Sequence, residues 1–174
     1  MLTNDDELMK FVDSYRDQGK GSDGLHSVFG NSARITEFGA ALGVAQIRRW
    51  PSMAADRRSI IDSYLTGLSD VPWLSFPWES DSRQNSGYKL IGMLDDSIDR
   101  HGLVAHLRTH GIGLAGGVYD TPLHRQPIFA GLVGTSRFPL ADWYSSRHVC
   151  LPVYPGLTPM MIDRVVSAVA GFGP

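Results

Sequence analysis

The sequence predicts an α/β fold in which long leading helices precede a small sheet with further helices packed against it. Three observations predict this fold. Apolar residues recur at helical spacing through the first third of the chain, and short apolar segments bounded by turn residues follow it. The chain then closes with a well-capped helical pattern over residues 158–171. One compact lobe preceded by long helices accounts for this order of segments.

The leading helices are expected within residues 1–67. In residues 3–19, the apolar side chains recur at helical spacing, Thr3 or Asn4 is expected as the N-cap, and Gly19 stands where a helix commonly ends. A second helix is expected from about Arg34 to Arg49. The apolar side chains that it is expected to bury are those of Ile35, Phe38, Leu42, Ala45 and Ile47. Pro51 is expected to separate it from a third helix that ends near Gly67.

Residues 68–174 are expected to form the small lobe. Apolar segments predict strands within residues 86–94 and 112–120, with a helix between them. A proline-bounded loop follows at residues 121–129, and a helix end with a short strand is expected within residues 141–156. Thr158 as N-cap, Pro159 at the first helical position and Gly171 as the stop define the terminal helix.

Composition excludes several classes of function. The formal net charge is -2 and the pI is about 6.3, so we expect neither nucleic acid nor a membrane surface as a partner. The N-terminal residues are acidic and lack the basic start and apolar stretch of a signal peptide, which favours the cytoplasm. The single cysteine, Cys150, lies among apolar residues and is expected to be buried. His106 and His110 share a helical face but lack a third ligand, so no metal site is expected.

Four stretches of the chain, taken in order, resemble a known family. They are "LTNDDELMKFVDSYRDQG", "GNSARITEFGAALGVAQIRR", "GVYDTPLHRQPIF" and "RHVCLPVYPGLTPMMIDRVVSAV". Together they are similar to the C-terminal part of the DegT/DnrJ/EryC1/StrS sugar aminotransferases, which are pyridoxal-phosphate enzymes of the type I, aspartate-aminotransferase fold. The resemblance implies that residues 1–67 correspond to the edge of the large domain and the interdomain helix. Residues 68–174 would then be the small C-terminal domain.

The resemblance also implies that the Schiff-base lysine and the rest of the large domain lie upstream of the first matching stretch. Lys10, Lys20 and Lys89 are the only lysines, and none stands where that nucleophile would. Transamination needs an amine that anchors the cofactor and moves a proton between substrate and cofactor. We therefore expect no catalytic residue in this chain, and pyridoxal phosphate only where a partner chain completes the site.

In the resembling enzymes, the loop that corresponds to Gly30–Arg34 crosses a dimer interface and holds the phosphate of the neighbour's cofactor. The resemblance implies cofactor-binding roles for Asn31, Ser32 and Arg34, although the family usually has Asn at the position of Ser32. Asn and Ser side chains donate to phosphate oxygens, and an arginine adds charge. The alternative is that Asn31 and Ser32 only cap a helix that begins near Arg34.

The Pro-Leu-His-x-Gln-Pro core of the third stretch lies near the sugar-nucleotide pocket in the resembling enzymes. The resemblance implies substrate contacts for His124, with Tyr119 and Arg125 orienting the substrate. The alternative is that Pro122 and Pro127 fix the loop and that His124 bonds only to backbone.

Three hypotheses for function follow. The first is a partial or split aminotransferase of the sugar-nucleotide or aminocyclitol class, as in antibiotic biosynthesis, completed by a lysine-bearing large-domain chain. The second is a non-catalytic binding module that forms a homodimer through its Ala- and Gly-rich helix, an apolar surface when it lacks a partner. The third is an incomplete reading frame. The sequence leaves the substrate and the amino donor open.

Overall fold

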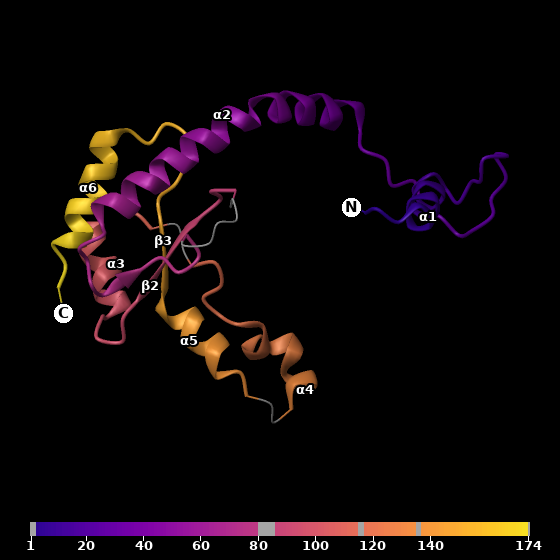
Figure 1. The fold of residues 1–174 in the computed structure, drawn as a ribbon. Helices are drawn as coiled ribbons and strands as arrows, with labels where there is room; N and C mark the ends of the chain where they lie inside the picture. The colour runs from indigo at the N-terminus through magenta and orange to yellow at the C-terminus, as the bar shows by residue number, and fades with distance from the viewer. Residues whose placement is uncertain (1–2, 80–85, 115–116, 135–136, 174) are drawn as a thin grey trace. The chain divides into compact units, whose positions relative to one another are not determined.

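The computed structural model describes residues 3–79, 86–114, 117–134 and 137–173 (Figure 1). It divides into two compact units, Met1–Trp50 and Pro51–Pro174. The division falls inside the longest helix of the chain. The interpretation of residues 1–67 and 68–174 as parts of two domains of a whole enzyme stays a prediction.

The first unit contains the helix α1 (Asp6–Arg16). Its N-cap is Asp5, whose Oδ1 accepts hydrogen bonds of 3.0 Å from the N–H groups of Glu7 and Leu8. The expected cap at Thr3 or Asn4 is therefore wrong, and Thr3 accepts a bond from the N–H of Asp5 instead. Past the last turn, Gly19 has a φ of 81° and its N–H donates to the carbonyl of Ser14 at 2.7 Å, which confirms the glycine end of this helix.

The helix α2 (Glu37–Gly67) is continuous, so the expected separation at Pro51 is wrong. Thr36 caps the N-terminus of α2, because its Oγ1 accepts a hydrogen bond of 3.1 Å from the N–H of Gly39. A proline inside a helix removes one hydrogen bond and destabilises the helix by about 3 kcal/mol. Burial of Ile60, Ile61 and Tyr64 in the last turns of α2 offsets that loss, because these residues belong to the core of the second unit.

The apolar side chains expected to be buried by a helix over residues 34–49 are exposed in this chain. The exposed fractions are 74% for Ile35, 84% for Phe38 and 73% for Ile47. Leu42 and Ala45 are exposed as well. The expectation of burial is wrong because helical spacing shows that a face is apolar, not that this chain supplies what covers it.

The second unit is built on a three-stranded antiparallel sheet. Its strands are β1 (Leu74–Ser75), β2 (Leu90–Leu94) and β3 (His148–Leu151), in the order β1-β2-β3. Across β2 and β3, Leu90 faces Leu151 and Met93 faces His148. The expected strand at 112–120 is wrong: the described residues of that segment, 112–114 and 117–120, form no strand.

In the second unit, α3 (Arg100–Thr109), α6 (Pro159–Ala170) and the end of α2 lie together beside the strands, and α5 (Pro139–Arg147) leads directly into β3 (Figure 1). The helix α3 is capped by Asp99 and contacts α6. The predicted ends of α6 are confirmed, since Thr158 accepts from the N–H of Met161 at 3.3 Å and Gly171 follows the helix. Between α3 and β3 lie the 3₁₀ turns η1 (Leu123–Arg125) and η2 (Pro127–Phe129), the short α4 (Ala130–Val133) and α5.

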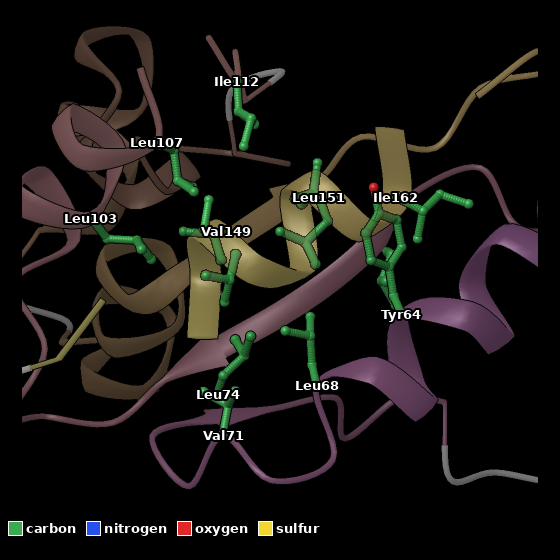
Figure 2. Close-up of a cluster of buried hydrophobic side chains, with 14 of the residues drawn as sticks. Tyr64, Leu68, Val71, Leu74, Leu103, Leu107, Ile112, Val149, Leu151 and Ile162 are labelled. Atoms are coloured by element: carbon green, nitrogen blue, oxygen red, sulfur yellow. The ribbon is translucent and has the colours of Figure 1, made fainter. Parts of the chain in front are cut away.

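The hydrophobic core gathers side chains from α2, α3, β3 and α6 around the sheet. Figure 2 shows residues of these elements pointing toward one another, among them Tyr64, Leu103, Leu107, Leu151 and Ile162. The mixed α/β class is therefore confirmed, with the sheet and its helices forming the core of the second unit.

Two smaller expectations are tested by this core. Cys150 is 2% exposed, as predicted, and burial raises the pKa of its thiol. His106 and His110 serve the fold, because Nε2 of His106 lies 2.9 Å from the carbonyl oxygen of Ala168 and Nδ1 of His110 lies 3.0 Å from that of His106.

Among the residues described, no three His, Cys, Asp or Glu side chains gather as a metal site would require. Within the same ranges, no helix has both the length and the apolar character of a membrane span.

The hydroxyl of Tyr64 is buried without a hydrogen-bond partner among the described residues, and burial raises its pKa well above the usual range. An unsatisfied buried hydroxyl destabilises a fold by about 1–3 kcal/mol. We expect Tyr64→Phe to raise the free energy of unfolding by roughly 1 kcal/mol in urea titrations, because the ring stays and the unpaired group goes. Tyr88→Phe, at an exposed position, is the control. A loss of stability in Tyr64→Phe would show that the hydroxyl has a partner in solution.

Candidate functional site

The loop Gly30–Arg34 is fixed by backbone hydrogen bonds to the C-terminal end of α1. The N–H of Asn31 donates to the carbonyl of Tyr15 at 2.7 Å, and the N–H of Ala33 donates to that of Arg16 at 3.1 Å. In return, the carbonyl of Asn31 accepts from the N–H of Gln18 at 3.1 Å. Helix-end carbonyls that lack partners within α1 are thereby satisfied, and the loop gains a defined backbone.

Two glycines allow this loop to approach α1 so closely. A Cβ on Gly30 would lie 2.1 Å from the backbone nitrogen of Gly19, and a Cβ on Gly19 would lie 1.8 Å from the carbonyl oxygen of Val28. No side chain fits at either position without moving backbone. Gly19 was predictable as a helix end. Its contact with Gly30 was not, because that contact depends on the path of the loop between the two glycines.

The side chains of Asn31 and Ser32 are exposed and form no hydrogen bond to any residue that the structure describes. Arg34 forms an ion pair with Asp17, with Nη2 2.8 Å from Oδ1 and both side chains about half exposed. The alternative that Asn31 and Ser32 cap the next helix is wrong, because α2 begins at Glu37 and Thr36 caps it. The loop therefore presents two polar side chains whose donors are available to a ligand.

Two of the three candidate substrate residues meet at one carboxylate. Nε2 of His124 lies 2.9 Å from Oδ1 of Asp142, and Nε of Arg125 donates to the same oxygen at 2.5 Å. The hydrogen bond between Arg125 and Asp142 lowers the pKa of the Asp142 carboxyl and raises the pKa of the Arg125 guanidinium. The alternative that His124 bonds only to backbone is wrong. Sequence reasoning missed Asp142, which stands on α5 and outside the motif.

Tyr119 belongs to a different part of this unit. It lies on the wall of a pocket of about 430 Å³ whose lining is almost entirely apolar. This aromatic pocket is also lined by Trp78, Ile91, Leu123, Tyr144 and His148. His124 and Arg125 are not among the lining residues, so the structure does not bring the three candidates into one pocket, although Pro122 and Leu123 of the same loop line it. Spacing in the sequence could not have found this pocket, because its walls come from four separate segments.

Comparison with known proteins identifies the family. A family model described as the DegT/DnrJ/EryC1/StrS aminotransferase family matches residues 1–170. The chain belongs to this family. Its members depend on pyridoxal phosphate.

Solved structures of the DegT/DnrJ/EryC1/StrS family share the fold. The chain is similar to an aminotransferase from Psychrobacter cryohalolentis, with 24% identity, a TM-score of 0.85, and coverage of 97% of this chain and 49% of that one. DesV of S. venezuelae, solved in complex with a ketimine intermediate, matches with 24% identity and a TM-score of 0.86, over 99% of this chain and 47% of that one. PseC of Helicobacter pylori, an aminotransferase of pseudoaminic acid biosynthesis, matches with 19% identity and a TM-score of 0.82, over 96% and 46%. The chain spans about half the length of these structures.

The residues present fit one end of the family's cofactor. Asn31 and Ser32 offer donors to a phosphate, and Arg34 lies in the same loop. The reactive end has no counterpart among the lysines. Lys10 pairs with Glu7 on the exposed side of α1, Lys20 lies in the loop that follows, and Nζ of Lys89 donates to the carbonyl of Gly117 at 3.3 Å. The donor set of this chain is therefore suited to the phosphate and not to the aldehyde.

Proposed function

We propose that this chain contributes the C-terminal part of a pyridoxal-phosphate-dependent sugar aminotransferase, with the reactive lysine on a separate large-domain segment. The observation that carries the proposal is the loop Gly30–Arg34. Its backbone is fixed on α1, while the side chains of Asn31 and Ser32 project without a partner among the described residues. A loop that has a defined backbone but unpaired side-chain donors is suited to a ligand supplied from outside this unit.

The loop acts on the phosphate of the cofactor. The amide of Asn31 and the hydroxyl of Ser32 donate to phosphate oxygens. Arg34 adds a positive charge that it shares with Asp17, and the half-exposed position of both groups lets the arginine turn toward a dianion. When bound, pyridoxal phosphate supplies the electron sink that transamination requires.

The second unit acts on the substrate, which we propose to be a keto-sugar linked to a nucleotide or a cyclic ketone. Asp142 accepts the Nε2 proton of His124, so Nδ1 is left as an acceptor for a substrate hydroxyl. Arg125 donates to the same carboxylate oxygen and so helps to hold Asp142 in place beside the histidine. Tyr119 offers a hydroxyl at the rim of the aromatic pocket, where an apolar face of the substrate is shielded from water.

Mixing experiments test this function. We expect the chain, combined with a lysine-bearing large-domain segment of the family from the same genome, to retain pyridoxal phosphate through desalting and to transfer an amino group. The double variant Asn31→Ala, Ser32→Ala removes two hydrogen bonds to a charged group, so cofactor affinity should fall by about tenfold or more. Ser22→Ala, at another exposed serine of the same unit, is the matched control.

Two results would contradict the proposal. One is a mixture that retains no cofactor with any large-domain segment encoded near this chain. The other is retention by the chain alone, with borohydride fixing the cofactor onto Lys10, Lys20 or Lys89. The second result would place the reactive amine within this chain.

A second function is favoured by the exposed apolar face of α2. Phe38, Leu42 and Ile47 are more than half exposed, which is typical of a surface that another protein covers. If a second copy of this chain covers it, the protein is a homodimeric binding module without catalysis. Light scattering after size exclusion distinguishes the two functions, because the module is a dimer alone and the split enzyme needs the large domain. A stable monomer that binds no apolar dye would contradict both.

A further inference from the structure

The segment Gly117–Asp120, which leads into the candidate substrate motif, is held by side chains instead of by a neighbouring strand. His148 is the most buried of them, with 6% exposed. Its Nε2 lies 2.7 Å from the backbone nitrogen of Val118, and its Nδ1 lies 2.8 Å from the carbonyl oxygen of Tyr144. A backbone N–H can only donate and a carbonyl can only accept, so His148 carries its proton on Nδ1 and accepts at Nε2. The bond from Val118 therefore requires the neutral ring, whereas the bond to Tyr144 requires only the proton on Nδ1.

Three further groups complete the anchorage. Asp120 forms an ion pair with Arg100 of α3 and also accepts from the N–H of Gly117. The hydrogen bond from Arg100 lowers the pKa of the Asp120 carboxyl, which keeps it ionised. Lys89, which precedes β2, donates to the carbonyl of Gly117 at 3.3 Å. The backbone groups of Gly117 and Val118 are thus paired with three side chains, those of Asp120, Lys89 and His148.

We propose that neutral His148 is a positioning residue for the segment Gly117–Leu123 and that protonation of its ring releases this segment. Val118, Tyr119 and Leu123 line the aromatic pocket together with His148, so the same contact sets the shape of that pocket. The assignment of this pocket to substrate rests on the proposed function. The anchorage by His148 does not.

Protonation acts through the geometry of Nε2. A charged imidazole donates from both nitrogens, so the bond to Tyr144 persists while the N–H of Val118 meets a second donor. The proton on Nε2 has another acceptor close by. Oδ1 of Asp120 and Nε2 of His148 lie 2.6 and 2.4 Å from the same point, the position that a Cβ on Gly117 would occupy. Acid therefore favours an exchange, in which His148 leaves Val118 and donates to Asp120.

The titratable groups near His148 include one anion, two cations and two neutral groups. Asp120 carries a negative charge and pairs with the cation of Arg100, and Lys89 carries a positive charge where it donates to the carbonyl of Gly117. The hydroxyl of Tyr144, on α5, is half exposed. The thiol of Cys150, on β3, faces the N–H of Val118 and stays neutral because burial raises its pKa. Imidazole is the side chain whose charge ordinarily changes between about pH 5 and 8, so these two pH values are the ones to compare.

Amide exchange and ¹⁵N spectra of the purified chain test the proposal without cofactor or large domain. In the wild type, we expect the protection factor of the Val118 amide to fall by about tenfold between about pH 8 and pH 5, relative to amides of β2. The ¹⁵N shifts of the His148 ring should report the Nδ1–H form at the higher pH. In His148→Gln, the amide oxygen accepts from Val118 and does not titrate, so protection should persist at both pH values. In His148→Phe, whose ring has no acceptor, protection of the Val118 amide should be lost at both pH values.

His101→Gln, at an exposed histidine of α3, is the control and should follow the wild type. The proposal is overturned if wild-type protection of Val118 does not change with pH. It is also overturned if His148→Gln repeats the wild-type change. Should His148→Phe fail to fold, as judged by the β2 amides, the wild type and His148→Gln still decide. A failure of the mixing experiment leaves these measurements unaffected, so the two proposals fail separately.

Discussion

Hydrogen–deuterium exchange of the purified chain alone should show a sharp difference between its two units. We expect amides of residues 5–50 to exchange with little protection, and amides of β2 and β3 to be protected by at least about a thousandfold. The reason is burial. No apolar side chain among the described residues of the first unit is buried, whereas α2, α3, α6 and the sheet of the second unit share one core. An isolated helix as short as α1, with 11 residues, is marginal in water.

Addition of the lysine-bearing large domain should then protect α1 and the first half of α2. Their apolar side chains, among them Phe11, Phe38 and Ile47, would be covered by that domain. Strong protection of residues 5–50 in the chain alone would contradict the prediction. Combined with a dimeric mass in light scattering, that result would favour the homodimeric module. The exchange experiment therefore separates the two proposed functions as well as testing stability.

Elements whose signals are local were predictable from the sequence. The cap, first proline and final glycine of α6 lie within the helix or beside it, and the structure confirms all three. The apolar runs of β2 and β3 and the burial of Cys150 were predictable for the same reason. Each of these features depends on a few neighbouring residues, so the periodicity and capping of one segment are enough to find it.

Features that depend on distant partners were not predictable. The apolar segment 112–120 forms no strand in its described residues, because His148, Lys89 and Asp120 occupy the backbone groups that a strand would pair. Pro51 does not end α2, because side chains farther along that helix reach the core. At the candidate site, the resemblance pointed to His124 and Arg125, but the sequence could not show that Asp142 binds both.

Among the glycines that the structure describes in the second unit, Gly117 should tolerate substitution least. A Cβ at this position would lie 2.4 Å from Nε2 of His148 and 2.6 Å from Oδ1 of Asp120. Neither atom belongs to a freely moving side chain, because His148 is buried and bonded at both ring nitrogens and Asp120 is paired with Arg100. We expect Gly117→Ala to lower the free energy of unfolding by about 2–4 kcal/mol in urea, through steric overlap and a lost buried hydrogen bond.

Gly113 provides a matched control for this variant. It lies four residues earlier in the same segment, and a Cβ there would meet nothing within 4 Å. Gly113→Ala should therefore change the free energy of unfolding by no more than about 0.5 kcal/mol. The difference between the two variants measures the space that His148 and Asp120 leave around Gly117, since both exchange one glycine for alanine. Equal effects would mean that the backbone of this segment, and not the contact with His148, determines the tolerance, and the anchorage of Val118 would lose its support.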